Sequence, residues 1–317
     1  MTFNVQNITI ANHPELAAAV ETAAQETGKH DGIDPFSEQF LLGLRDERLN
    51  HQHWFIESDG KVEAVAASDG SSAELFVVPG ARQEGRGTAL FDAVAPTPVW
   101  AHGNFAGAQA LAKAKDLRIT RHLLVMAIEG EALKTAAQKP DTELLVANYT
   151  QSVERFGKEH VDQQWLKANN EAFSWHPEQG GWDMERLHRG MEPAWFDEKD
   201  VIFFWDVPAN AEETTKESTE KTLPNMAGFH WTKWHDETEE GFGEVYVVGL
   251  ADAYRGRRLG GPLLNAGLAR MAEKGADRVI LYVEADNGPA VKAYERLGFE
   301  IAENHVVYET SDIPGKD

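Results

Sequence analysis

Two glycine-rich turns in this sequence have the composition of sites that bind a diphosphate. Residues 82–88 read RQEGRGT and residues 255–261 read RGRRLGG; each turn follows an apolar stretch that predicts a strand and precedes a pattern that predicts a helix. The first turn of a helix presents unpaired backbone N–H groups and a partial positive charge, and glycine lets a ligand come close to the backbone. The neighbouring arginines add charged hydrogen-bond donors. We therefore expect both turns to be suited to a diphosphate.

Several other kinds of site are excluded by what the sequence lacks. Neither turn contains the Gly-Lys-Ser/Thr of a Walker A loop, and neither has a G-x-G-x-x-G with an acidic residue at the distance that dinucleotide binding requires. The chain has no cysteine, which rules out disulfides, thiolate metal sites and a cysteine nucleophile. Its 12 histidines show no metal-binding spacing such as HExxH. We expect no metal site.

The composition argues for a globular protein that binds neither nucleic acid nor membranes. The 317 residues are 42% hydrophobic and 26% charged, and 30 Lys plus Arg against 52 Asp plus Glu give a net charge of −22. Such an acidic surface repels DNA, RNA and anionic lipid, so a bound polyanion needs a local cluster of cations. No apolar run reaches the ~18 residues of a membrane span, and the N-terminal residues do not resemble a signal peptide. We expect a cytoplasmic monomer.

The elements around the two turns occur twice along the chain. In each half, helical patterns are followed by the two strands of a hairpin, a third strand, the glycine-rich turn, a helix, a strand, another helix and a last strand. The first hairpin turns at Asp59-Gly60, a pair that favours a tight turn. The periodicity is lost near residue 140, where KPD is a turn signal, so we place a domain boundary between 1–140 and 141–317. The chain is predicted to be a duplication of one α/β unit.

The turns and a C-terminal signature resemble the GNAT family of N-acetyltransferases. The pattern Q/R-x-x-G-x-G/A is similar to the acyl-CoA pyrophosphate loop of that family, and residues 287–299 resemble its signature N-x-x-A-x-x-x-Y-x-x-L-G-F. Six further segments resemble, more narrowly, the mycothiol synthase family of tandem GNAT enzymes. They are WAHG (100–103), HPEQGGW (176–182), WFD (195–197), GFHWTK (228–233), GEVYV (243–247) and LYVEADN (281–287).

The resemblance implies a fold, a reaction and its ligands. The fold would be α/β of the α+β type, with two tandem GNAT domains, each a mixed, mostly antiparallel central sheet flanked by helices. The reaction would transfer the acetyl group of acetyl-CoA to the cysteinyl amine of desacetylmycothiol, which gives mycothiol in the last step of its biosynthesis. Acetyl-CoA would be a co-substrate, and no metal would take part.

The resemblance also implies roles for individual residues. Glu244, at the start of the strand that leads to the second turn, would be the general base that deprotonates the amine, and Tyr294 would protonate the departing CoA thiolate. The coenzyme contacts in the second half would be Val248, Gly249, Leu250, Arg255, Gly256, Arg257, Arg258, Leu259, Gly260, Gly261, Asn287, Ala290, Val291 and Lys292. Those in the first half would be Leu75, Phe76, Val77, Arg82, Gln83, Glu84, Gly85, Arg86, Gly87 and Thr88.

The first half has different residues at the positions that match the proposed catalytic pair. When the two turns are aligned on their first arginines, Glu244 pairs with Ser71. Matching the strands would instead pair it with Glu74 and require the removal of three residues before the turn, and we prefer the register of the turns because phosphate geometry fixes it. All six tyrosines lie beyond residue 140, and Ala112 stands near the position of Tyr294. We predict that the first domain is not catalytic, with acetyl-CoA binding there as a hypothesis.

One residue departs from the pattern of the second turn. Arg258 stands where the motif has its first glycine. A positive φ would be costly for arginine at this position. We therefore expect either that Arg258 has an ordinary φ and adds a contact to phosphate, or that the turn is shifted.

The acceptor would carry many hydroxyl groups and a cationic amine. By resemblance, its pocket would be lined by Glu38, Glu178, Lys233, Tyr282 and Glu244, with Glu38 reaching across from the first domain. Taken singly, Glu38 also fits the first turn of a helix, Glu178 an exposed turn and Lys233 an outward strand face. Two other functions stay open: a tandem GNAT enzyme that acetylates another amine, such as an aminoglycoside or a protein N-terminus, and an acyl-CoA sensor without turnover. The pairing of an acid with a tyrosine in one half argues against the sensor.

Overall fold

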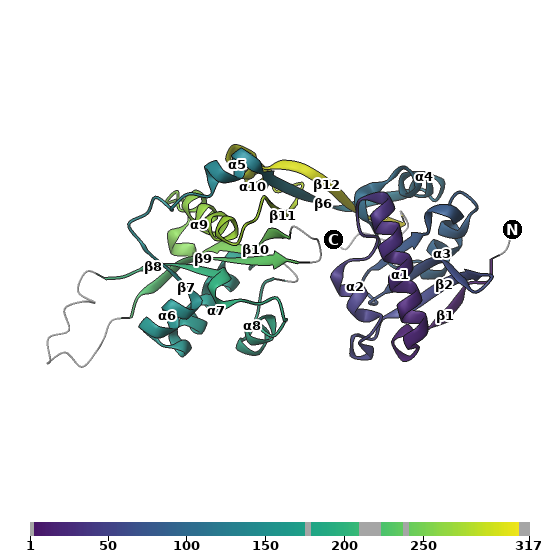
Figure 1. Ribbon diagram of the computed structural model, residues 1–317, viewed down its shortest axis with the longest axis horizontal. Helices are drawn as coiled ribbons and strands as arrows, with labels where there is room; N and C mark the ends of the chain where they lie inside the picture. The colour runs from purple at the N-terminus through teal and green to yellow at the C-terminus, as the bar shows by residue number, and fades with distance from the viewer. Residues whose placement is uncertain (1–2, 175–178, 209–222, 237–240, 311–317) are drawn as a thin grey trace. The chain divides into compact units, whose positions relative to one another are not determined.

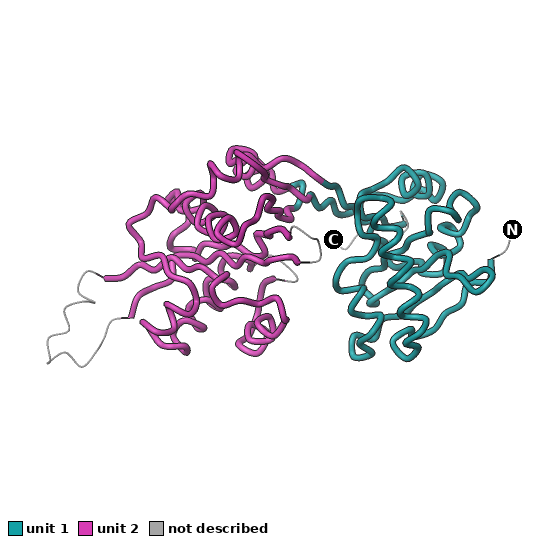
Figure 2. The backbone as a smooth tube through the Cα atoms, viewed as in Figure 1, with its two compact units in different colours: residues 1–124, 284–286, 303–317 teal, residues 125–283, 287–302 magenta. Residues whose placement is uncertain are grey.

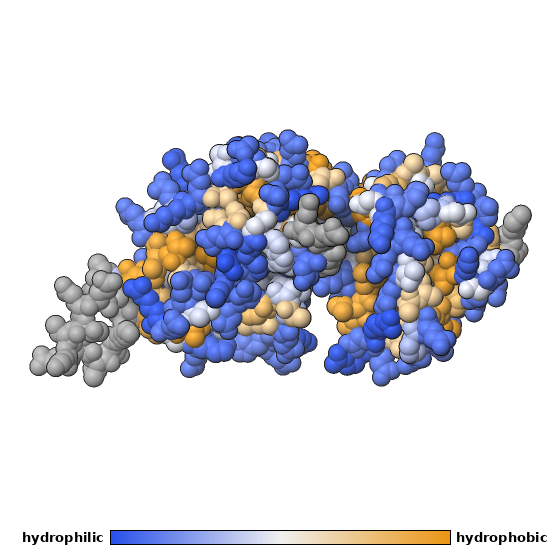
Figure 3. All heavy atoms as spheres, in the orientation of Figure 1, coloured by the Kyte–Doolittle hydropathy of each residue, from blue (hydrophilic) through white to orange (hydrophobic). Residues whose placement is uncertain are grey.

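The computed structural model describes residues 3–174, 179–208, 223–236 and 241–310 and divides into two compact units (Figures 1 and 2). Unit 1 contains residues 1–124, 284–286 and 303–317, and unit 2 contains residues 125–283 and 287–302. Hydrophilic residues cover most of the visible surface of each unit (Figure 3), as the composition predicts. None of the described helices is both long enough and apolar enough to cross a bilayer.

Unit 1 is built on a mixed sheet in which all neighbours except one pair are antiparallel. The order is β1-β2-β3-β4-β5-β12, and only β4 and β5 run parallel. The hairpin between β2 and β3 turns at Asp59 and Gly60, both with positive φ (51° and 74°), as the sequence predicts. The strands are β1 (Gln6–Ile8), β2 (Gln52–Ser58), β3 (Lys61–Ser68), β4 (Ala73–Val77), β5 (Val99–Ala101) and the part of β12 (Glu300–Thr310) that begins at residue 303.

Helices cover both faces of the unit 1 sheet because residues of β2 and β3 alternate between two apolar clusters. Phe55 and Val65 face helices α1 and α2, whereas Ile56 and Ala64 face helix α3. The helices are α1 (Pro14–Asp31), α2 (Glu38–Gly43), α3 (Arg86–Val94) and α4 (Ala106–Ala114), with short 3₁₀ turns η1 (Ile10–Asn12), η2 (Glu47–Leu49), η3 (Pro79–Ala81) and η4 (His102–Asn104).

Unit 2 repeats this plan. Strands β7, β8, β9 and β10 are antiparallel neighbours, and β11 runs parallel to β10. The strands are the part of β6 (Leu117–Glu129) from residue 125, β7 (Leu145–Asn148), β8 (Val201–Asp206), β9 (Asn225–His235), β10 (Phe242–Leu250) and β11 (Arg278–Glu284). The helices are α5 (Gly130–Ala136), α6 (Tyr149–Phe156), α7 (Lys158–Ala172), α8 (Met184–Gly190), α9 (Gly260–Glu273) and α10 (Gly288–Leu297), with 3₁₀ turns η5 (Glu198–Asp200) and η6 (Asp252–Tyr254).

Helices α7 and α9 lie on opposite faces of the unit 2 sheet. Trp165 of α7 packs edge-on against Trp231 of β9, with 5.2 Å between ring centroids. On the other face α9 lies so close to β10 that a Cβ added to Gly243 would sit 2.7 Å from the Cγ of Met271. Because side chains alternate along a strand, the next residue, Glu244, points to the α7 face. The apolar core therefore orients the carboxylate that the sequence singles out.

The last strand of the chain belongs to unit 1. Val306, Val307 and Tyr308 of β12 pair with β5, and Val306 and Tyr308 pack against Ala112. Chain order alone, which puts this strand at the end of the second half, does not reveal that pairing. The division at 140/141 remains a prediction about which stretch of the chain folds on its own.

Candidate active site

The strand register places Glu244 where the ladder between two parallel strands ends. β10 pairs with β11 at Gly243, Glu244 and Val245, and in the described part of the chain this ladder goes no further, although both strands continue. On its other side β10 stays paired with β9 as far as Leu250, with a bulge between Val245 and Val247. The bulge changes the direction of β10 just beyond Glu244, and β-bulges are common next to active sites.

Glu244 is a buried carboxylate held by a histidine. It is 7% exposed, and its Oε2 accepts a hydrogen bond of 2.6 Å from Nε2 of His235 on β9. The His235 ring stacks on Phe242, with centroids 4.4 Å apart and an interplanar angle of 5°. The sequence reasoning missed His235. The alternation of side chains along a strand could have identified it, because residues 233 and 235 face the same side of β9.

Lys233 is the direct cross-strand neighbour of Glu244. Their Cα atoms are register partners, and the lysine is only 4% exposed, which excludes the outward strand face considered above. Its Nζ lies 4.8 Å from the ring centroid of Trp195 and 6.0 Å from that of Tyr246, so two aromatic faces stabilise the buried cation. A buried acid and a buried base thus lie side by side on the α7 face.

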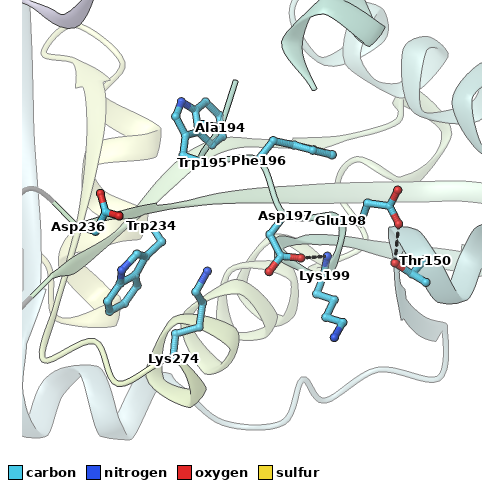
Figure 4. A pocket seen from close by; sticks show the side chains of 10 residues that line it. All are labelled: Thr150, Ala194, Trp195, Phe196, Asp197, Glu198, Lys199, Trp234, Asp236 and Lys274. Carbon is cyan, nitrogen blue, oxygen red and sulfur yellow. Dashed lines mark hydrogen bonds between the residues drawn. The ribbon is translucent and has the colours of Figure 1, made fainter. Parts of the chain in front are cut away.

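Trp195 is also a wall of a cavity of about 530 Å³ in unit 2 (Figure 4). Aromatic, acidic and basic side chains line it together. The lining residues are Thr150, Ala194, Trp195, Phe196, Asp197, Glu198, Lys199, Trp234, Asp236 and Lys274. Within the described ranges, no group of three or more acidic or histidine side chains is arranged to hold a metal ion.

Tyr294 lies in α10 and is partly buried beside Phe299, with 5.8 Å between ring centroids. Burial raises the pKa of the Tyr294 phenol above its usual value of 10.0, so the hydroxyl keeps its proton near neutral pH. Asn287 caps the helix, because its side chain accepts a hydrogen bond of 3.3 Å from the N–H of Ala290. The N-x-x-A spacing of the signature therefore has a direct structural role at the start of α10.

The second glycine-rich turn corrects the expectation for Arg258. Its φ is +61°, in the left-handed region, so the ordinary φ that we expected is wrong. Gly256, two residues earlier, has φ +75°. The first turn has the same pair of left-handed positions at Gln83 (φ +64°) and Gly85 (φ +95°). The two turns therefore share one backbone path, in which glycine and a larger residue have exchanged places.

The arginines of the second turn are exposed at the surface. Arg255 donates to the carbonyl oxygen of Glu171 and pairs with Asp252 at 2.9 Å. Arg257 stacks over the Tyr254 ring at 4.8 Å, and Arg258 is also exposed. These guanidinium groups form the local cationic cluster that a polyanion needs on a chain of net charge −22.

The arginines of the first turn are instead occupied by carboxylates of unit 1. Arg82 makes two hydrogen bonds to Asp31, of 2.9 and 2.6 Å. Arg86 pairs with Glu63 at 2.7 Å and with Glu84 at 2.5 Å. Their positive charge is therefore largely neutralised within the unit.

The strand register also corrects the expected match of Glu244 with Ser71. Glu74 takes the second position in the ladder of β4 with β5, as Glu244 does in the ladder of β10 with β11. The bulge in β10 and its greater length account for the extra residues before the second turn. Glu74 is 2% exposed; its Oε2 accepts from the N–H of Ser37 at 2.7 Å, and its Oε1 lies 3.0 Å from Nε2 of His102.

Unit 1 also contains a tyrosine, from beyond residue 140 in the sequence. Tyr308, brought in by β12, donates a hydrogen bond of 2.8 Å to Oδ1 of Asn104. On the same strand, Nδ1 of His305 lies 2.9 Å from Nδ1 of His102, and its Nε2 lies 3.1 Å from Glu303. Unit 1 therefore contains a buried acid and a tyrosine, although Tyr308 comes from β12 and not from the position of Ala112.

The other predicted acceptor contacts are distributed over the chain. Glu38 begins α2 in unit 1 and is exposed, and Tyr282 of β11 is 50% exposed. Glu178 lies outside the described residues. Of the five predicted acceptor residues, the structure brings Lys233 and Glu244 together.

Comparison with known proteins agrees with this architecture. The Acetyltransferase (GNAT) family matches residues 164–299. The mycothiol acetyltransferase of Corynebacterium aurimucosum is 57% identical to this chain and covers 98% of it and 100% of its own length. That of Corynebacterium efficiens is 45% identical and covers 98% of each chain.

Two solved structures share the fold of the whole chain. A GCN5-related N-acetyltransferase from Sphaerobacter thermophilus has a TM-score of 0.64 and 18% identity, and covers 100% of this chain and 99% of its own. A tandem GNAT protein from the clavulanic acid biosynthesis pathway has a TM-score of 0.65 and 16% identity, and covers 99% of this chain and 100% of its own. The predicted fold, two tandem GNAT domains with mixed sheets, is confirmed. The chain belongs to the mycothiol acetyltransferase family of GNAT N-acetyltransferases.

Proposed function

We propose that this chain transfers the acetyl group of acetyl-CoA to the cysteinyl amine of desacetylmycothiol and so forms mycothiol. The family relationship over nearly the full chain supports the reaction and the acceptor. The observation that carries the mechanism is the buried Glu244 beside Lys233 at the end of the β10–β11 ladder.

The reaction needs two proton transfers around one acyl transfer. The amine nitrogen attacks the thioester carbonyl carbon, a C–N bond forms, and the C–S bond breaks. Glu244 takes a proton from the amine, and the Tyr294 hydroxyl gives one to the leaving sulfur. An α-amino group titrates near ~7.7–8, so a carboxylate is an adequate base. The cationic amine loses two protons in all: one restores the Tyr294 hydroxyl through solvent and the other is released, so the net products are the amide, free CoA and one proton.

We assign the coenzyme to the second turn and the strand before it. The backbone of Val248, Gly249 and Leu250 would hold the pantetheine arm on the side of β10 where the ladder with β11 has ended. The diphosphate would lie at the start of α9, where Gly260 and Gly261 leave the backbone open to a ligand. The predicted contacts from Arg255 to Gly261, and those of Asn287, Ala290, Val291 and Lys292, remain part of this proposal.

We propose that unit 1 does not catalyse, for a reason that differs from the sequence argument. Glu74 is buried with its Oε2 held by the Ser37 N–H, and the turn arginines Arg82 and Arg86 are paired with carboxylates. A charged ligand would have to displace these contacts. Acetyl-CoA binding by the first turn therefore stays a hypothesis that stoichiometry can test.

The acceptor is proposed to contact Lys233, Tyr282 and Glu244, together with Glu38 and Glu178. A ligand rich in hydroxyl groups with a cationic amine suits carboxylates and a few fixed donors. We place the enzyme in the cytoplasm as a monomer: its donor is an intracellular metabolite, and a net charge of −22 disfavours self-association.

Mass spectrometry of acetylated products across a panel of amines tests this function. The panel contains desacetylmycothiol, other cysteinyl sugars, an aminoglycoside and a peptide with a free N-terminus. We expect desacetylmycothiol to have the highest kcat/KM. A higher kcat/KM for another amine would show that this amine, and not desacetylmycothiol, is the acceptor. Acetyl-CoA binding without any acetylated product would favour a sensor.

A further inference from the structure

We infer that His235 is a positioning residue for the general base: it holds one oxygen of Glu244 so that the other oxygen takes the proton from the acceptor amine. This inference rests on the proposed role of Glu244. No family motif in the sequence contains His235, and its assignment comes from the geometry of β9 and β10 alone.

The contact between the two side chains is short and shielded from water. Nε2 of His235 lies 2.6 Å from Oε2 of Glu244, and their side chains are 14% and 9% exposed. Hydrogen bonds to an ionised acceptor are shorter and stronger than neutral ones. A bare Nε2 lone pair at this distance would repel the carboxylate, so the contact assigns the proton to Nε2 and fixes the tautomer of the ring.

The fold fixes the direction of that hydrogen bond. His235 and Phe242 are register partners across β9 and β10, and so are Lys233 and Glu244, so the histidine reaches the carboxylate diagonally. The ring is stacked flat on Phe242 and cannot turn without losing that contact. A donor held by two strands and a stacked ring is pre-organised, which is what placing a catalytic group requires.

The hydrogen bond gives the two oxygens of the Glu244 carboxylate different roles. A carboxylate taken out of water needs donors to replace its hydration. His235 provides one donor at Oε2, and the hydrogen bonds among the described residues include none at Oε1. When the amine gives up its proton, an N–H bond breaks and an O–H bond forms at Oε1. His235 keeps its own proton throughout, and solvent receives the transferred proton after the product leaves.

Unit 1 provides an internal comparison for this division. Glu74 has the same place in its ladder, but its Oε2 accepts from the Ser37 N–H, and its Oε1 lies 3.0 Å from Nε2 of His102 with no hydrogen bond between them. The same type of acid is thus held by a backbone N–H in one unit and by a histidine side chain in the other. A single histidine donor leaves Glu244 able to act as a base.

Steady-state kinetics of two variants of the full chain test the inference. His235→Leu removes the donor, and His235→Gln keeps an amide N–H near the position of Nε2. We expect His235→Leu to lower kcat by about 10- to 100-fold, with the KM for acetyl-CoA and for the acceptor within about 2-fold of wild type. His235→Gln should recover most of the lost kcat.

His160→Gln is the matched control. His160 is also half-buried in unit 2, stacks on Trp205 and bonds the carbonyl oxygen of Pro224 at 2.9 Å. Its kcat should equal that of wild type, and thermal melts should show that all three variants are folded. If His235→Leu retains wild-type kcat, or if a folded His235→Gln is as slow as His235→Leu, the inference is wrong.

Glu244→Gln separates this inference from the proposed function. If Glu244→Gln is fully active, the base assignment fails and the role of His235 fails with it. If Glu244→Gln is inactive while His235→Leu is fully active, only the inference fails. If the base assignment and the inference are both correct, His235→Leu should have no further effect on kcat in a Glu244→Gln background, because the two residues act as a unit.

Discussion

Glu74 in unit 1 and Glu244 in unit 2 occupy the same position in their sheets, each in the second step of a parallel ladder. The groups that contact the two carboxylates are different. Glu74 accepts a hydrogen bond from the backbone N–H of Ser37, whereas Glu244 is held by the side chain of His235 and lies beside the buried Lys233. The two copies thus share the position of the acid and differ in the groups that surround it.

The first prediction concerns Tyr294. Tyr294→Phe should lower kcat by about 10- to 100-fold, the usual range for the loss of a general acid. Because burial raises the pKa of the phenol above 10.0, a fall in wild-type kcat from its ionisation should occur only above pH 10. Tyr308→Phe in unit 1 is the matched control and should retain wild-type kcat. Wild-type turnover by Tyr294→Phe would reject the acid role.

The second prediction concerns the left-handed Arg258. Replacing a non-glycine residue at φ +61° by glycine relieves strain of about 1 kcal/mol, so Arg258→Gly should raise the melting temperature of unit 2. The same change removes a cation and should raise the KM for acetyl-CoA. Arg257→Gly, outside the left-handed region, should raise that KM without raising the melting temperature. A lower melting temperature for Arg258→Gly would contradict the strain argument.

The third prediction concerns two buried histidines, one in each unit. Burial lowers the pKa of His53 and of His230 from 6.5 to about 4. The unfolded chain therefore binds more protons than the folded chain between pH 6.5 and 4, and stability falls as the pH drops through that window. Each histidine should cost about 2 kcal/mol of stability by pH 5. Thermal melts at pH 7 and pH 5 measure the loss, and equal melting temperatures would contradict it.

The fourth prediction concerns the number of coenzyme sites. Because Arg82 and Arg86 are paired with carboxylates, isothermal titration should find one equivalent of acetyl-CoA bound per chain. Reversing the exposed charges with Arg257→Glu and Arg258→Glu should abolish that binding. The full chain is the right sample, because a fragment ending at residue 140 lacks the β12 residues that complete the unit 1 sheet. Two equivalents for wild type would show that the first turn also binds.

Much of the fold could be predicted from the sequence because its signals are local. The hairpin at Asp59-Gly60, the two glycine-rich turns and the repeated order of elements depend on neighbouring residues. The place of β12 could not be predicted this way, because a strand near the C-terminus pairs with β5, roughly 200 residues away. That pairing also places Tyr308 in unit 1, although the first 140 residues contain no tyrosine.

The site was predicted less completely than the fold. Glu244 and Lys233 were named, and their adjacency depends on the β9–β10 register, which chain order does not give. The match of Glu244 to Ser71 was wrong because counting from the turn ignores a bulge in β10. His235 was missed because it belongs to no motif and gains its importance only from the strand opposite.

The central claim is that Glu244 removes the proton from the cysteinyl amine of desacetylmycothiol. The most direct measurement is the rate at which wild type and Glu244→Gln form mycothiol from acetyl-CoA, followed by mass spectrometry, with Glu154→Gln on the surface of α6 as the control. The account predicts that Glu244→Gln loses at least about 100-fold in kcat while the KM for acetyl-CoA stays near its wild-type value. Mycothiol formation at the wild-type rate by folded Glu244→Gln would contradict it.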